Sequence, residues 1–147
     1  MPIDVQTYFE QRAKERTWAS LYEGPLDARS YNFFTRREAV ARLLDAEGTF
    51  PRVLDVGCGT GDYAELAFRL GGEYFGVDFS SAMIAQARQR FEGRGAPCRF
   101  LVGAGEALPY RDNSFDLVLA IGYLEYFRDP IAPLQEIRRV LKPGGVL

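Results

Sequence analysis

The stretch Val53-Leu54-Asp55-Val56-Gly57-Cys58-Gly59-Thr60-Gly61 decides the fold class of this chain. It begins as a short run of β-forming residues and ends in glycines at alternate positions, directly before a segment with helical spacing. Glycines let the backbone turn tightly and approach a ligand closely, because they carry no Cβ atom. Free N–H groups at the start of a following helix attract anionic groups. Taken alone, the stretch predicts a strand–turn–helix unit that holds a nucleotide-like ligand, or simply a tight turn.

Strand-like and helix-like segments alternate through residues 51–147. The first strand is expected at 52–56 and further strands at 73–77, 98–102 and 115–121, and Val146-Leu147 resemble the start of a fifth. Between them, helices are expected over 62–70, from Ser80 or Ser81 to Phe91, and over 131–141. This rhythm predicts a doubly wound α/β fold, with a parallel sheet and right-handed crossovers. Sheets of this kind bind ligands at the carboxyl ends of their strands, near the switch point.

Residues 1–50 differ in character and are interpreted as a helical cap before an α/β domain at 51–147. They are polar and rich in aromatic residues, and helices are expected over 4–22 and 30–46. One interpretation is that these helices only pack on the sheet, and the other is that they form a lid over the ligand site. The candidates with a polar tip for the second interpretation are Tyr8, Tyr22, Tyr31, Arg36 and Arg37.

Composition excludes several classes of protein. The 147 residues are 47% hydrophobic and 26% charged, which is ordinary for a globular domain, and the net charge of -2 gives no attraction to nucleic acid or anionic membranes. No apolar run approaches the ~20 residues of a membrane span, and no signal peptide is evident. Two cysteines, Cys58 and Cys98, and no histidine argue against a disulfide framework or a bound metal. We therefore expect a cytoplasmic protein with no metal, nucleic-acid or membrane partner.

Acidic residues around the glycines narrow the choice of ligand. The glycines follow Gly-x-Gly-x-Gly with Asp62 next, whereas the dinucleotide fingerprint is Gly-x-Gly-x-x-Gly. Asp55 on the preceding strand disfavours a pyrophosphate and favours a cationic ligand. Asp78 closes the second strand, seventeen residues after Gly61, where a carboxylate can accept hydrogen bonds from ribose hydroxyls. The alternative for Asp78 is a cap on the next helix.

Five stretches in this order resemble class I S-adenosylmethionine (SAM) dependent methyltransferases of the UbiE/UbiG-like small-molecule type. The resemblance covers about residues 50–147 and includes the glycine turn and the acidic end of strand two. The matching stretches are Val53 to Gly61, Gly76-Val77-Asp78-Phe79-Ser80, Gly105-Glu106-Ala107-Leu108-Pro109-Tyr110, Ser114-Phe115-Asp116-Leu117-Val118 and Leu141-Lys142-Pro143-Gly144-Gly145-Val146-Leu147.

The resemblance implies roles for residues at the matching positions. The glycines would pass along the methionine and ribose parts of SAM, Asp78 would hold the ribose hydroxyls, and Phe79 would pack on the adenine. The adenine edge would lie at residues 105–107 and the methionine end at residues 120–121. The expected SAM-contacting residues are Tyr8, Tyr22, Arg37, Asp55, Gly57, Cys58, Gly59, Gly61, Asp78, Phe79, Met83, Gly105, Glu106, Ala107, Ala120 and Ile121.

Two departures from the family pattern affect these expectations. An acid often follows the glycine of strand three and accepts from the adenine amino group, but Ala104 stands there, so adenine selectivity would rest on backbone groups or on Glu106. The family fold also continues for roughly three more strands, so a C-terminally incomplete, truncated domain is expected. Strand four would then have only a stub beside it, and a homodimer or a domain swap would cover the exposed edge.

Methyl transfer from SAM to a small-molecule acceptor, with S-adenosylhomocysteine as the product, is the expected activity. Glu125, Tyr123 and Tyr126 follow strand four and are candidates for a catalytic base, Tyr123 being expected near the reacting methyl group. A catalytically incomplete SAM-binding module is one alternative. An NAD-type oxidoreductase is another, which the glycine spacing disfavours. Oxygen, nitrogen and carbon acceptors share such a cofactor half, so the acceptor is not specified.

Overall fold

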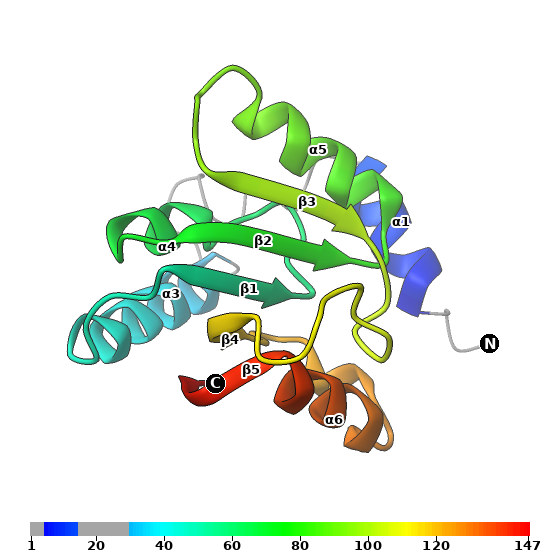
Figure 1. Ribbon diagram of the computed structural model, residues 1–147. Coiled ribbons are helices and arrows are strands. Elements are labelled where there is room, and N and C mark those ends of the chain that lie inside the picture. The colour runs from blue at the N-terminus through cyan, green and yellow to red at the C-terminus, as the bar shows by residue number, and fades with distance from the viewer. Residues whose placement is uncertain (1–4, 15–29) are drawn as a thin grey trace.

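The computed structural model describes residues 5–14 and 30–147, and a single five-stranded sheet forms its centre (Figure 1). The strand order is β3-β2-β1-β4-β5, and every pairing is parallel. The strands are β1 (Arg52–Val56), β2 (Glu73–Asp78), β3 (Cys98–Val102), β4 (Phe115–Leu119) and β5 (Leu141–Val146). The helices are α1 (Val5–Lys14), α3 (Tyr31–Asp45), α4 (Ala64–Arg69), α5 (Ser81–Phe91) and α6 (Ile131–Val140), with a 3-10 turn, η1, at Leu124–Tyr126.

The chain winds outward from β1 through β2 to β3, and then returns to place β4 on the other side of β1. This confirms the predicted doubly wound α/β plan. The switch point therefore lies between the carboxyl ends of β1 and β4, where such folds bind ligands. It brings the glycine turn after β1 next to the segment that follows β4.

Alternate residues of β1 face two separate hydrophobic cores. Val53 packs with residues of α3, α4 and α5 on one face, whereas Leu54 and Val56 pack with α6 on the other. Burying each such aliphatic side chain stabilises the fold by about 1.5–3 kcal/mol. The two cores hold the strand ends in place, so the site at their carboxyl edge is built on rigid elements.

Several local expectations agree with the structure. The first and third strands have the predicted bounds. Ser80 is the N-cap of α5, because its Oγ accepts a hydrogen bond from the Met83 amide at 3.2 Å. The fourth strand ends at Leu119, two residues earlier than expected, so Ala120 and Ile121 lie in the segment that follows it.

The helix after the glycine turn begins at Ala64, not at Asp62 as expected. Asp62 is buried before the helix, where Thr60 Oγ1 donates to its Oδ2 at 3.0 Å and Arg90 Nη1 lies 2.7 Å from its Oδ1. Gly61, between Thr60 and Asp62, has a φ of +79°. These contacts extend the turn to Tyr63, the N-cap residue.

The prediction of a stub for strand five was wrong. β5 begins at Leu141, and the residues expected to form a turn belong to it. Leu141 pairs with Phe115 and Val146 with Leu117, so a bulge absorbs the extra residues between these pairs. Lys142 Nζ adds an ion pair to Asp116 Oδ1 at 2.8 Å. β5 lies at one edge of the sheet, and its pairing with a second copy stays a prediction.

α1 packs alongside α5 near the β3 edge of the sheet (Figure 1). Glu10 Oε1 accepts a hydrogen bond from the Ser81 amide at 2.9 Å, and Gln86 donates to the carbonyl of Ala13. The expected helix over 4–22 is thus seen at Val5–Lys14, while residues 15–22 lie outside the described part of the chain. Within residues 5–14 and 30–147, no helix has the length and apolar character to cross a membrane.

Candidate functional site

The glycine turn leaves β1 in a backbone conformation that requires glycine. Gly57 has a φ of +75°, and a Cβ built there would lie 2.8 Å from Cδ2 of Tyr123. The Gly57 and Cys58 amides both donate to the carbonyl of Val77, at 2.8 and 3.1 Å, which ties the turn to β2. The turn is therefore held against both neighbouring strand ends.

Asp78, the last residue of β2, fixes this turn through its carboxylate. Its Oδ2 accepts from the Gly59 amide at 2.9 Å, and its Oδ1 accepts from the Ser80 amide at 2.9 Å. Burial raises the pKa of Asp78, while these two backbone hydrogen bonds act to lower it. The carboxylate thus joins the glycine turn to the start of α5. Each carboxylate oxygen accepts more than one hydrogen bond, so Asp78 retains capacity for a ligand.

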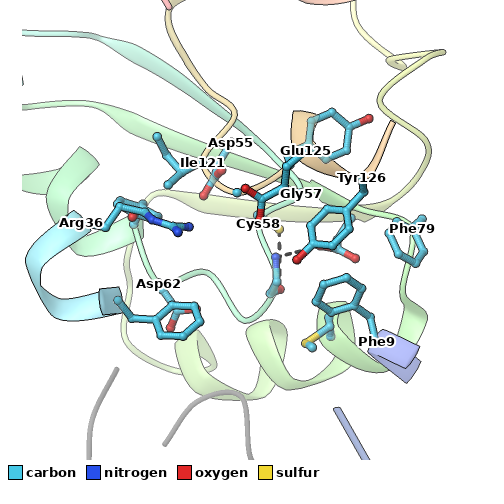
Figure 2. Close-up of a pocket in the computed structure, with 17 residues that line it drawn as sticks. Phe9, Arg36, Asp55, Gly57, Cys58, Asp62, Phe79, Ile121, Glu125 and Tyr126 are labelled. Carbon is cyan, nitrogen blue, oxygen red and sulfur yellow. Dashed lines mark hydrogen bonds between the residues drawn. The ribbon is translucent and has the colours of Figure 1, made fainter. Parts of the chain in front are cut away.

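Two adjoining cavities open at the switch point. The glycine-turn cavity has a volume of about 110 Å³ and lies between the glycine turn, α3, α1 and the segment after β4 (Figure 2). The loop cavity, about 240 Å³, lies between β2 and the loop that joins β3 to β4. The two share the lining residues Gly57, Asp78, Phe79, Tyr123 and Tyr126.

Asp55 gives the glycine-turn cavity a titratable wall. It is 2% exposed, and Tyr74 donates its hydroxyl to Oδ2 at 2.6 Å. The pKa of Asp55 is raised to about 7, chiefly by burial and less by the charges of Asp62 and Asp78, while the Tyr74 hydrogen bond acts to lower it. A cationic ligand group would relieve this repulsion, whereas an anionic group would increase it.

Arg36 and Tyr63 supply hydrogen-bond donors to the same cavity. The Arg36 guanidinium points into it from α3, opposite Phe9, Phe79 and Tyr126 (Figure 2). Tyr63 is buried, and in the part of the chain that the structure describes its hydroxyl has no hydrogen-bond partner. Buried polar groups are normally satisfied, so this hydroxyl fits a ligand atom or a bound water. A guanidinium is well suited to a carboxylate.

Tyr123 forms the wall between the two cavities. Its ring lies against Gly57, and its hydroxyl occupies the place that a Cβ of Gly105 would take. The hydroxyl is 3.5 Å from Oε2 of Glu106. Burial raises the pKa of Tyr123, and the charge of Glu106 raises it further. This hydroxyl is therefore engaged at the loop side, and its pKa makes it a poor base at neutral pH.

Most of the residues expected at the site line one of the two cavities. The residues brought together are Asp55, Gly57, Cys58, Gly59, Asp78, Phe79, Met83, Gly105, Glu106 and Ile121, with Tyr123, Glu125 and Tyr126 of the segment after β4. Gly61, Ala107 and Ala120 do not line them.

Expectations for the N-terminal segment are only partly reproduced. Arg36, rather than the neighbouring Arg37, lines the glycine-turn cavity. Tyr8 is 37% exposed outside both cavities and accepts a hydrogen bond from Arg12 Nε at 3.1 Å. Tyr22 lies outside the described residues.

Sequence reasoning missed several lining residues. Phe9, Phe33, Asp62, Tyr63 and Gly122 line the glycine-turn cavity, and Val5 and Phe127 line the loop cavity. One signal was available on α3, because residues three apart on a helix share a face and Phe33 therefore points the same way as Arg36.

Comparison with known proteins assigns the family. Residues 54–147 match the family described as a methyltransferase domain. The chain belongs to this methyltransferase family. A curated relative of this chain is the demethylmenaquinone methyltransferase of Thermus thermophilus, with 43% identity over 115 aligned residues, which cover 76% of this chain and 51% of that protein.

Another relative carries a different activity in its name. The mitochondrial arginine-hydroxylase NDUFAF5 of Danio rerio is 33% identical to this chain over 141 aligned residues, which cover 92% of this chain and 41% of that protein. The chain thus spans about half the length, or less, of these two relatives.

A solved structure supports the same fold. A SAM-dependent methyltransferase of Thermotoga maritima, described as a possible histamine N-methyltransferase, aligns with a TM-score of 0.68 and 29% identity. The alignment covers 94% of this chain and 57% of that one.

Proposed function

We propose that the two cavities bind SAM and that the protein transfers its methyl group to a small-molecule acceptor. The observation that carries this proposal is the position of Asp55 and Asp78 beside the glycine turn at the switch point. A ligand with ammonium and sulfonium charges is complementary to such walls. The pyrophosphate of a dinucleotide would face the same two carboxylates unfavourably.

The chemistry of the linings indicates which part of SAM each cavity would take. The glycine-turn cavity offers Asp55 to an ammonium group and Arg36 to a carboxylate, which suits the amino-acid end. The loop cavity is bordered by Val77, Phe79 and Phe127 and suits a flat base. Among residues 5–14 and 30–147 the buried Tyr63 hydroxyl has no hydrogen-bond partner, which supports this fit. Buried polar groups are normally paired, and a ligand atom at the charged end would satisfy this hydroxyl.

The residues of this chain would contribute mainly by positioning and by electrostatics. Bound SAM supplies a methyl group on a sulfonium that is already activated. The cavity walls formed by Ile121 and Tyr126 would exclude water from the acceptor side. Glu125 also lines the glycine-turn cavity and is the best placed of the three candidates to accept a proton from an acceptor. Burial and the neighbouring Glu125 raise the pKa of Tyr126, which makes it a weaker base.

The division of the chain follows from the same proposal. Residues 1–50 would act as a cap over the cavities and residues 51–147 as the SAM-binding α/β domain. In support, Phe9 of α1 contacts Phe79 and Tyr126 edge-on, with ring centroids 6.1 and 5.3 Å apart. We place the reaction in the cytoplasm, consistent with the free thiols Cys58 and Cys98.

Calorimetric titration with SAM, S-adenosylhomocysteine and NAD tests the binding part of this proposal. We expect both sulfur ligands to bind and NAD not to bind. Binding of NAD without S-adenosylhomocysteine would instead support an oxidoreductase. An exposed control, Asp45→Asn, should leave all three titrations unchanged, because Asp45 pairs with Arg69 on the surface and lines neither cavity.

Methyl transfer needs a separate test, because the relative from Danio rerio is named for hydroxylation. Incubation with SAM labelled in the methyl group and a panel of small quinol, amine and acid acceptors should yield labelled product. Binding of SAM with no transfer to any acceptor would favour a SAM-binding module without activity.

A further inference from the structure

The loop between β3 and β4 forms one wall of the loop cavity, and its backbone has no regular secondary structure. Gly103, Gly105 and Glu106 contribute to that wall. Within residues 5–14 and 30–147, the Glu106 side chain is approached by the Tyr123 hydroxyl, at the long distance of 3.5 Å. An irregular wall can hold a ligand firmly only where other groups fix its backbone.

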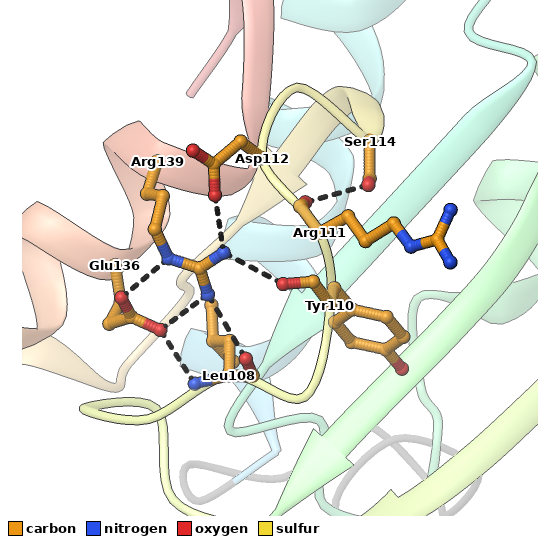
Figure 3. A network of polar contacts seen from close by, with 7 residues as sticks. All are labelled: Leu108, Tyr110, Arg111, Asp112, Ser114, Glu136 and Arg139. Carbon is orange, nitrogen blue, oxygen red and sulfur yellow. Dashed lines mark hydrogen bonds and ion pairs between the residues drawn. The ribbon is translucent and has the colours of Figure 1, made fainter.

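Arg139 near the end of α6 fixes the part of the loop that follows Glu106 (Figure 3). Its Nη2 donates to the carbonyl of Leu108 at 3.0 Å, and its Nη1 donates to the carbonyl of Tyr110 at 2.7 Å and to Asp112 Oδ1 at 2.9 Å. Nε and Nη2 also donate to Oε1 and Oε2 of Glu136, both at 2.7 Å. A guanidinium has five N–H donors, and these five acceptors use all of them.

Glu136 completes the attachment from the same helix. Its Oε2 accepts from the Leu108 amide at 2.8 Å, so both polar groups of the Leu108 backbone are bound to the Arg139–Glu136 pair. The carbonyls of Arg139 and Val140 accept from the Asn113 and Ser114 amides at 2.9 and 2.7 Å. The loop is thus held from Leu108 to Ser114, and Glu106 stands two residues before the first attachment.

We propose that Arg139 and Glu136 are positioning residues for the ligand, which hold the Gly105–Glu106 wall of the loop cavity in its binding geometry. This inference rests on the proposed function, because it takes the ligand to be SAM with its base in that cavity. Lysine cannot replace Arg139, since an ammonium has three donors without the planar fork that reaches five acceptors.

The test uses Arg139→Lys, which keeps the charge, with Arg138→Lys as the matched control. Arg138 is exposed on the same helix, and its side chain makes no ion pair or hydrogen bond with the described residues. Hydrogen exchange of the Leu108 amide reports on the attachment without any ligand. Calorimetry with S-adenosylhomocysteine and with 5′-methylthioadenosine, which lacks the amino-acid end, reports on the base side of the site.

We expect Arg139→Lys to accelerate exchange at Leu108 and to weaken both ligands by a similar factor, about tenfold, because small displacements of a binding wall are costly. Arg138→Lys should change neither. Faster exchange with unchanged affinity for both ligands would show a purely structural role and overturn the inference.

A second variant, Glu136→Gln, keeps the test decisive if Arg139→Lys does not fold. This variant removes the ion pair with Arg139 and leaves an amide oxygen that still accepts from the Leu108 amide. It should therefore weaken the binding of both ligands, with a smaller increase in Leu108 exchange than Arg139→Lys causes. Unchanged affinity in this folded variant would also overturn the inference. Failure of the unmodified protein to bind either ligand would instead refute the proposed function.

Discussion

Replacement of Asp55 by asparagine should change how the stability of the protein depends on pH. The folded protein retains the Asp55 proton up to a pKa of about 7, whereas an unfolded chain releases it near the ordinary value of 3.8. Between these values the folded state binds more protons, so the free energy of unfolding falls as the pH rises. An asparagine side chain at this position cannot ionise, and its oxygen can still accept the Tyr74 hydroxyl.

The magnitude follows from the width of this interval. From 3.8 to about 7, at about 1.4 kcal/mol for each pH unit, the loss corresponds to about 4 kcal/mol. About 2.3 kcal/mol of that falls between pH 5 and pH 7, where most other carboxyl groups stay ionised. Because Asp55 is almost fully buried, solvent screening does not reduce this figure much.

Urea unfolding at several pH values between 5 and 7.5 measures the effect. The difference in free energy of unfolding between the unmodified protein and Asp55→Asn should shift by about 2.5 kcal/mol across that range in favour of the variant. Asp45→Asn serves as the control, because Asp45 lies in an exposed ion pair with Arg69. Parallel pH profiles for the unmodified protein and Asp55→Asn would refute the assignment of a raised pKa to this carboxyl.

Three further predictions concern the walls of the cavities. Arg36→Gln should weaken the binding of S-adenosylhomocysteine by about tenfold through loss of a charge-assisted hydrogen bond. The affinity for 5′-methylthioadenosine, measured by calorimetry, should stay unchanged. Equal losses of affinity for both ligands would contradict the placement of Arg36 at the amino-acid end of SAM. Gly105→Ala should destabilise the protein by about 1–3 kcal/mol in urea unfolding, because the new methyl group would overlap the Tyr123 hydroxyl. Adding Tyr123→Phe to this variant should recover part of the lost stability. Strictly additive effects of the two substitutions on the free energy of unfolding would argue against the contact. Asp78→Ala should weaken S-adenosylhomocysteine by at least about 1.5–3 kcal/mol, since Asp78 borders both cavities and holds Gly59; an unchanged calorimetric affinity would remove it from the site.

Features encoded over a few neighbouring residues could be predicted from the sequence. The bounds of β1 follow from its β-forming run between Pro51 and the glycines, and the Ser80 cap follows from its position before an apolar face. The bounds of β5 depend on a bulge against β4 and on the Lys142–Asp116 ion pair. Neither is visible in a local pattern, and glycines in that stretch favoured a turn.

The site was predictable where motifs place residues on strand ends, and less so elsewhere. Asp55, Gly57 and Asp78 are fixed by the ends of β1 and β2. The choice between Arg36 and Arg37 depends on the rotation of α3 against the sheet, which sequence spacing does not define. The attachment by Arg139 joins residues far apart in the chain, and the sequence offered no signal for it.

The proposed function depends above all on binding of SAM in the two cavities at the glycine turn. Titration of the isotopically labelled protein with S-adenosylhomocysteine, followed by amide chemical shifts, tests it most directly. We predict shifts concentrated at Gly57 and Gly59 on one side and at Gly105 and Glu106 on the other. Saturable binding that leaves these amides unchanged, or no binding at all, would contradict the account.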